Sequence, residues 1–219
     1  MLTVVALLAM ANDASCRPME LDARISECTD IVKDMMQAPD ANIPKDLIKR
    51  SHAIIIFPSV IKAGLGLGGH YGKGVILRRN PSTAKWGPPA FLTLVGGSFG
   101  WQIGVQSTDL ILLIMNDVSL RSIFRDKFTI GADASVAAGP VGRDASAGTD
   151  IDFSAGILSY SRAKGIFAGV SVKGSVIEVD WSANEAYYGS EKSIVDIFFG
   201  GKGPMSPAAA RLVQILNRY

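Results

Sequence analysis

Apolar residues recur at helical spacing near the beginning of the chain. Between Glu20 and Met36 they fall every three or four positions with polar residues between them, and the apolar set is Leu21, Ile25, Cys28, Ile31, Val32, Met35 and Met36. This spacing predicts a helix over 20–36 that ends before Pro39. Pro44 is well placed to open a short second helix that runs through Arg50.

Short apolar or alternating runs, broken by glycine, fill the chain from residue 53 to about residue 180. The runs 53–57, 74–77, 91–95 and 109–115 predict strands, the first of them closed by Pro58. Residues 167–180 alternate on both sides of Lys173-Gly174, which predicts a hairpin with a two-residue turn. Small residues within 131–139 indicate backbones that pack closely at the bends of a curled sheet or barrel.

Helical spacing returns in residues 206–218, with Pro207 in the first turn and with Leu212, Ile215 and Leu216 on one face. The order is therefore helices, many antiparallel strands, and a helix, in one domain. We expect an α+β fold with N-terminal helices, a curled antiparallel β-sheet or barrel-like core with Gly-rich strands, and a C-terminal helix.

The apolar run 2–11 is about half as long as a bilayer-spanning helix. Its length and the small residues Ala9 and Ala11 are typical of a cleaved secretory signal, although no Lys or Arg precedes the run. The alternatives are a buried N-terminal helix and a lipoprotein-like leader that is lipidated at Cys16. We expect residues 1–18 to be the leader and 19–219 the domain, exported to the periplasm or cell envelope.

Composition excludes several classes of protein. Apolar residues make up 48% of the 219 positions, enough for a sizeable core and too many for a disordered chain. Two Cys and two His are too few for a disulfide framework or a four-ligand zinc site. The formal net charge of +2 gives no support to a nucleic-acid partner. We expect no metal and no cofactor.

Two motifs of enzymes occur in the wrong context. Residues 64–69 match GxGxxG, but the residues that follow predict a strand, whereas a dinucleotide site needs a helix there. Residues 96–100 match the GxSxG motif of serine hydrolases around Ser98, but a strand is again predicted after it where the motif needs a helix. In those hydrolases the catalytic His follows the Ser in the sequence, whereas His52 and His70 both precede Ser98. We therefore expect no enzyme, with a hydrolase that uses Ser98 as a remote third hypothesis.

Acidic residues are absent from 47–108, whereas basic residues keep their average frequency there. Seven bases in this segment, interleaved with aromatic residues, are Lys49, Arg50, Lys62, Lys73, Arg78, Arg79 and Lys85. Such a segment attracts phosphates, because each base near an anionic membrane surface contributes about 1 kcal/mol. The alternative is that these bases are scattered around a barrel and share no face.

Taken in order, several segments resemble the SYLF domain family of lipid-binding domains. The resemblance is carried by 57–75 (FPSVIKAGLGLGGHYGKGV), Trp86 with Pro88, 96–114 (GGSFGWQIGVQSTDLILLI), 127–143 (KFTIGADASVAAGPVGR), 159–180 (SYSRAKGIFAGVSVKGSVIEVD) and 187–189 (YYG). It covers about residues 21–219.

The resemblance implies binding of acidic phospholipids, and actin binding in some eukaryotic members. The short chain resembles the bacterial, single-domain type. The family brings no agreed catalytic residues, but it places a Lys at Lys62 and a basic or polar residue near Lys73. In some members an amphipathic N-terminal helix contacts lipid. The corresponding helix here, 20–36, is acidic, so we assign lipid contact to 47–85 instead.

These arguments predict a non-enzymatic domain that binds anionic phospholipid membranes through Lys49, Arg50, Lys62, Lys73, Arg78, Arg79 and Lys85. The alternative is a structural or protein-interaction module that offers the same basic surface to an acidic protein partner.

The leader hypothesis predicts the result of a truncation. Deletion of residues 1–11 is expected to leave the melting temperature nearly unchanged, because a terminus that buries little apolar area contributes little stability. If the run belongs to the core instead, the deletion removes several buried side chains that each contribute about 1.5–3 kcal/mol to stability. A large decrease in the melting temperature would therefore contradict export.

Overall fold

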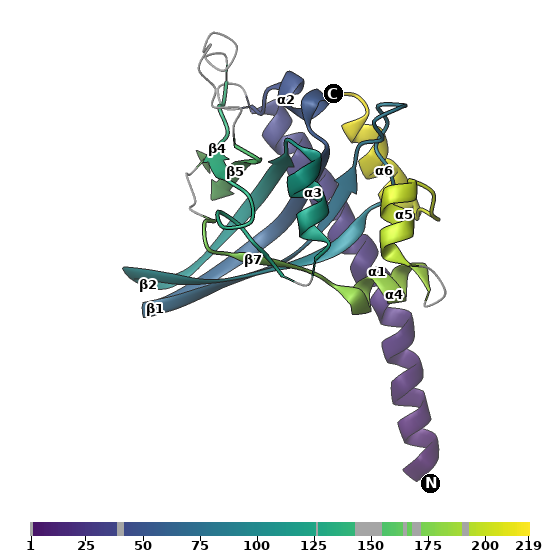
Figure 1. The fold of residues 1–219 in the computed structure, drawn as a ribbon. Coiled ribbons are helices and arrows are strands. Elements are labelled where there is room, and N and C mark those ends of the chain that lie inside the picture. Colours follow the sequence, from purple (N-terminus) through teal and green to yellow (C-terminus); the bar gives the residue numbers. More distant parts are fainter. Residues whose placement is uncertain are drawn as a thin grey trace.

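A computed structural model of the chain describes residues 2–38, 42–125, 127–142, 155–163, 166–167, 172–189 and 193–219. The side chains of 2–18, 64–67, 98–104 and 166–167 are outside the described part. Helices pack on both faces of a curled sheet that is built mainly from two long strands (Figure 1). The predicted α+β class is confirmed.

Helix α1 spans Leu2–Gln37, so the helix predicted over 20–36 is the C-terminal half of a longer one. Its buried face consists of the predicted apolar residues, with Ile25, Cys28 and Met35 fully inaccessible. Within the part of the chain that the structure describes, no helix combines the length and apolar character that crossing a bilayer requires. The leader 1–18 stays a prediction.

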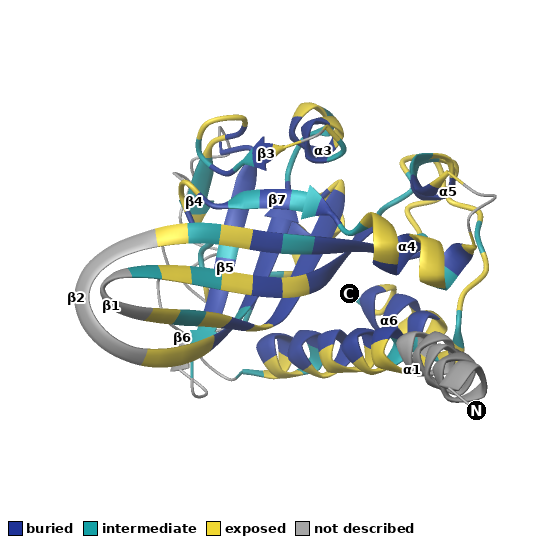
Figure 2. Cartoon of the chain, turned by 90° about the horizontal axis from the view of Figure 1, so that it is seen from below, coloured by how far each residue is buried: buried dark blue, intermediate teal, exposed yellow. Residues whose placement is uncertain are grey.

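Strands β1 (Ala53–Arg78) and β2 (Ala90–Ile114) pair antiparallel along almost their whole length, as Figure 2 shows. The predicted stop at Pro58 is wrong, because a bulge between Phe57 and Val60 takes up the proline and the ladder continues. In this bulge Ser59 has a φ of 53°, and its backbone N–H donates to Asp109 Oδ1 at 3.1 Å. The Gly-rich motifs 64–69 and 96–100 lie in these strands, so neither precedes a helix.

Short strands extend the sheet on both sides of β2. Strand β7 (Val176–Val179) pairs with the first half of β2 and with β3 (Phe128–Thr129). Strand β5 (Ile157–Ala163) pairs with the second half of β2 and with β6 (Ile166–Phe167). Strand β4 (Val136–Ala138) pairs parallel to β5, which corrects the expectation of a wholly antiparallel sheet.

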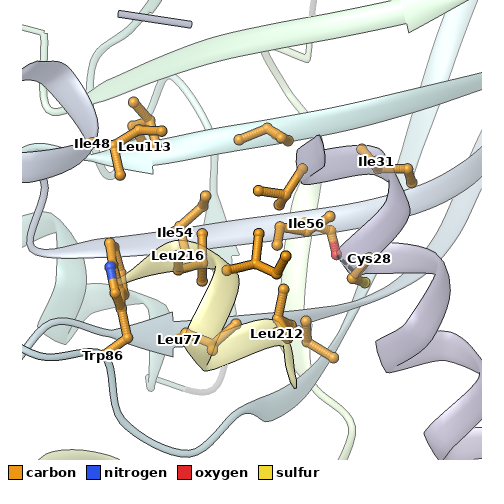
Figure 3. Close-up of a cluster of buried hydrophobic side chains, with 14 of the residues drawn as sticks. Cys28, Ile31, Ile48, Ile54, Ile56, Leu77, Trp86, Leu113, Leu212 and Leu216 are labelled. Atoms are coloured by element: carbon orange, nitrogen blue, oxygen red, sulfur yellow. Dashed lines mark hydrogen bonds between the residues drawn. The ribbon is translucent and has the colours of Figure 1, made fainter. Parts of the chain in front are cut away.

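The sheet has a hydrophobic core on each face. Because successive strand residues point to opposite faces, Ile54 and Ile56 contribute to one core and Ile55 and Phe57 to the other. Helices α1 and α6 (Pro207–Leu216) cover the first face, where Leu216 lies beside Ile54 and Leu212 belongs to the same core (Figure 3). Helices α3 (Asp117–Ile123) and α5 (Ile194–Gly200) belong to the second core.

The predicted short helix and C-terminal helix are confirmed as α2 (Lys45–Arg50) and α6. Sequence patterns missed α3, α5 and α4 (Trp181–Tyr188), which are each eight residues long or shorter. Each of the three begins at a side-chain N-cap, supplied by Asn116, Asp180 and Ser193.

The turn predicted at Lys173-Gly174 is confirmed. The Ser175 N–H donates to the Val172 carbonyl at 3.0 Å, and Gly174 has a φ of 84°, which favours glycine. The first arm of the predicted hairpin, 168–171, lies outside the described residues.

Gly74 lies where strand β1 curls back over its own first half. A methyl group there would overlap the carbonyl oxygen of Ile56 and the ring of Phe57, so only glycine allows this close approach. Gly97, on the paired strand β2, has open space at the same atom.

This contrast gives a matched pair of substitutions. Gly74→Ala is expected to lower the free energy of unfolding by about 1–3 kcal/mol, since backbone atoms must shift. Gly97→Ala is expected to be neutral or slightly stabilising. Urea denaturation of both variants measures the difference, and equal midpoints would contradict the close approach.

Candidate anion-binding cleft

A basic cleft of about 340 Å³ lies where α2, the connection after β1 and the end of α6 converge. Figure 1 shows α2 and the C-terminal end of the chain at the same end of the domain. The residues that line the cleft are Lys45, Ile48, Lys49, Arg79, Ala84, Trp86, Leu216, Asn217, Arg218 and Tyr219. Four of these side chains are cations, and none is an Asp or Glu.

Helix α2 places two lysines on the cleft. Its residues Leu47 and Ile48 are buried in the core beneath, and this anchors the helix and leaves the others exposed. Lys45 and Lys49 are four residues apart, so they lie on the same side of the helix. The Lys45 Nζ is 5.4 Å from the centre of the Tyr219 ring, a cation–π contact that joins α2 to the chain end.

Arg79 is held in a fixed position between α2 and the connection to β2. Its Nε donates to the Ala84 carbonyl at 3.0 Å, and its Nη1 donates to the Lys49 carbonyl. The loop around it is ordered by Asn80, whose side chain accepts from the N–H groups of Ser82 and Thr83. These two hydrogen bonds orient the guanidinium at the cleft.

Trp86 connects this loop to α6. The indole is 6% exposed and packs beside Leu77 and Leu216 (Figure 3). The backbone N–H of Trp86 donates to Asn217 Oδ1 at 3.2 Å. This bond holds the end of α6 against the loop, and it positions the neighbouring Arg218 at the cleft.

The charges of the cleft are uncompensated by side chains. In the ranges that the structure describes, none of Lys45, Lys49, Arg79 and Arg218 forms an ion pair with Asp or Glu. Excess positive potential in a concave site attracts anions and concentrates them there. The arrangement thus suits a phosphate or carboxylate ligand.

The structure brings together only part of the predicted lipid-binding set. Lys49 and Arg79 line the cleft, Arg50 ends α2 next to Lys49, and Lys85 is exposed in the loop before Trp86. Lys62, Lys73 and Arg78 lie elsewhere, so the seven bases do not share one face.

Arg78 supports the fold instead of the cleft, because neighbouring strand residues point to opposite faces. Its Nη1 donates to the Phe199 carbonyl at 2.6 Å, and its guanidinium carbon lies 5.1 Å from the Phe199 ring centre. This carbonyl is near the C-terminus of α5, where backbone acceptors lack helical partners. Arg78 is therefore a C-terminal cap of α5.

Lys62 and Lys73 lie on opposite faces of the β1–β2 ribbon. Lys62 shares its face with Val60 and His70. The pKa of His70 is lowered by burial first and by the Lys62 charge second. His70 Nε2 is 2.8 Å from Ser175 Oγ. Lys73 lies on the other face, against α1 and α4.

Comparison with known proteins places the chain in a family. A sequence model described as "Ysc84: Las17-binding protein actin regulator" matches residues 95–219. The chain belongs to the Ysc84 family. The resemblance to SYLF domains is thereby confirmed.

Relatives of the Ysc84 family cover most of the chain. Protein YSC84 from Saccharomyces cerevisiae is 34% identical over 181 residues, which is 81% of this chain and 38% of that protein. LAS seventeen-binding protein 3 from the same yeast is 33% identical over 181 residues, 81% of this chain and 39% of that protein. The rat SH3 domain-containing YSC84-like protein 1 is 28% identical over 208 residues, 92% of this chain and 60% of that protein. The chain thus spans 60% or less of these relatives.

Sequence reasoning missed Lys45 and Arg218 as members of the cleft. Lys45 precedes the acid-free segment by two positions and stands next to Asp46, and Arg218 is more than a hundred residues away from that segment. The signal that could have pointed to Lys45 is its four-residue spacing from Lys49 on a predicted helix. For Arg218 no local signal exists, since only the packing of α6 brings it to the cleft.

Measurements of stability test whether Arg78 caps α5 while its exposed neighbours do not stabilise the fold. Arg78→Met is expected to cost about 1.5–3 kcal/mol, because a charged hydrogen bond to a helix end is lost. The exposed Lys85→Met is the control and is expected to stay within about 0.5 kcal/mol of the parent. Thermal unfolding measures both. Equal stability of the two variants would contradict the capping role of Arg78.

Proposed function

We propose that this chain is a non-enzymatic binding domain, and that its basic cleft binds the phosphate groups of anionic phospholipids at a membrane surface. The observation that carries the proposal is the convergence of Lys45, Lys49, Arg79 and Arg218 without a carboxylate side chain among the lining residues. The family's description as a binding protein, and not as an enzyme, supports the non-enzymatic part.

The cleft contains one cation in a fixed position and three on exposed side chains. Arg79 is locked by its two carbonyl hydrogen bonds and offers a preset charge, whereas the exposed lysines and Arg218 can follow a headgroup. Each base close to an anionic surface contributes about 1 kcal/mol. Tyr219 borders the same cleft and is partly exposed, and tyrosine favours the membrane–water interface.

An acidic surface of a protein partner is the second candidate ligand of the same cleft. The family's description names Las17 binding and actin regulation, and one yeast relative is named as a LAS seventeen-binding protein. Clustered carboxylates on an actin-type partner would meet the same four cations with the same salt dependence. This candidate differs from the first in its ligand and uses the same residues.

Export to the periplasm or cell envelope belongs to the same proposal. The apolar run 2–11 with Ala9 and Ala11 supports it. In that location the cleft would meet envelope phospholipids. Lipidation of Cys16 would hold the domain at such a membrane by a second means.

The lipid proposal is tested by co-sedimentation with vesicles of increasing anionic content. The double variant Lys45→Glu/Arg218→Glu is expected to lose at least about 2 kcal/mol of binding, roughly thirtyfold in affinity. The control is Lys127→Glu/Lys202→Glu, which makes the same charge change at exposed residues outside the cleft. The loss is expected to shrink with salt, because exposed charges are screened over about 8–10 Å.

Two outcomes would count against lipid binding. If both double variants lose affinity equally, net charge and not the cleft is responsible. If no vesicle composition is bound, co-sedimentation with actin filaments tests the second candidate, and binding that is lost only in the Lys45→Glu/Arg218→Glu variant supports the protein partner.

A further inference from the structure

A second pocket, of about 360 Å³, lies between α1, β1 and α4, on the face of the sheet that α1 covers. Its charged lining residues are Glu20 and Arg24 from α1, Lys73 from β1 and Asp180 at the start of α4. It shares no lining residue with the basic cleft. Two cations and two carboxylates therefore meet around one cavity.

Arg24 is the unusual residue of this pocket because it is buried without a full set of partners. The residue is 7% exposed, and its guanidinium carbon lies 5.6 Å from the Phe91 ring centre. Its Nη1 is buried and makes no hydrogen bond. The nearest carboxylates, Glu20 and Asp180, are both 3.9 Å away, which is beyond hydrogen-bond distance.

Asp180 is already committed to the fold. Its Oδ1 accepts from the Ala183 N–H at 3.1 Å and from Ser182 Oγ at 2.9 Å, as the N-cap of α4. It is thus held in place and does not move to satisfy Arg24. A buried guanidinium nitrogen that has an ion pair at 3.9 Å but no hydrogen bond is costly, so an anion in the pocket would supply the missing acceptor.

Lys73 faces the same space with a free charge. It is exposed, and within the described ranges its side chain has no hydrogen bond or ion pair. An anion between Arg24 and Lys73 still leaves the negative charges of Glu20 and Asp180 to be balanced. A primary ammonium group on the same ligand would balance them and donate hydrogen bonds, which a quaternary ammonium cannot do.

Large apolar residues are exposed beside this pocket. Trp181 precedes the lining residue Ser182 and is 60% exposed, Met19 precedes Glu20 and is 76% exposed, and Tyr71 shares a strand face with Lys73 and is 46% exposed. Trp and Tyr are the residues that concentrate at the membrane–water interface. This rim favours a ligand that is part of a membrane over one free in solution.

We infer that the pocket of Arg24, Lys73, Glu20 and Asp180 binds the headgroup of phosphatidylethanolamine, with the phosphate on the two cations and the ammonium group on the two carboxylates. Trp181, Met19 and Tyr71 then rest in the interfacial layer around it. The inference rests on the proposed function only in taking the domain to a membrane, and it adds a zwitterionic lipid to the anionic one.

Vesicles without net charge separate the two sites. Co-sedimentation is measured with phosphatidylcholine vesicles that contain or lack phosphatidylethanolamine, so that no anionic lipid is present for the basic cleft. Phosphatidylethanolamine is expected to increase binding, and Lys73→Gln is expected to reduce this increase about fivefold. The control is Lys62→Gln, on the opposite face of the same ribbon, which is expected to keep it.

Two further measurements test the chemistry and the source. Soluble glycerophosphoethanolamine is expected to compete for the pocket of the parent protein, and glycerophosphocholine is not. Trp181→Ser is expected to weaken binding to the vesicles and to leave binding of the soluble headgroup unchanged. If Trp181→Ser leaves vesicle binding intact, the membrane source is wrong.

The inference is overturned if phosphatidylethanolamine has no effect on binding, or if Lys73→Gln and Lys62→Gln reduce it equally. The variant Lys45→Glu/Arg218→Glu is expected to retain this binding. If phosphatidylethanolamine has no effect but anionic vesicles are bound, the proposal for the pocket is wrong and that for the cleft stands. If phosphatidylethanolamine increases binding but anionic lipid does not, the proposal for the cleft is wrong and that for the pocket stands.

Discussion

The antiparallel ladder between β1 and β2 is the interaction on which the rest of the structure depends. The two strands, 26 and 25 residues long, support both hydrophobic cores, and all the helices and short strands are arranged around them. The ribbon curls, and the curl brings the two halves of β1 together at Gly74. Bulges take up the change in register that curling requires. The glycine at position 74 is thus a requirement of the curvature.

Local patterns were sufficient for the fold class and for the longest helices, because their information lies within a few neighbouring residues. The helix face of α1 and the first turn of α6 at Pro207 followed directly from spacing. The extent of β1 did not, because Pro58 normally ends a strand and its accommodation depends on Asp109, fifty residues away. Helix α4 was missed because its cap, Asp180, lies in what looked like the end of a strand.

The sequence predicted a positively charged site but only some of the residues that line the cleft. The absence of acids over 47–108 drew attention to Lys49 and Arg79, which the structure places in one cleft. Adjacent bases nevertheless have different roles, since Arg78 caps α5 and Arg79 lines the cleft. A residue count cannot separate them, because strand alternation sends neighbours to opposite faces. Arg218 joins the cleft through tertiary packing alone.

The basic cleft is assembled from both ends of the domain, with α2 from the first quarter of the chain and Arg218 from its last two residues. An occupant of the cleft is bound only by the native state, so it adds RT ln(1 + [L]/Kd) to the free energy of unfolding. By the same linkage, fraying of α6 and release of the occupant are coupled equilibria. A ligand in the cleft would therefore stabilise the C-terminal helix, and unfolding of that helix would remove Arg218 from the site.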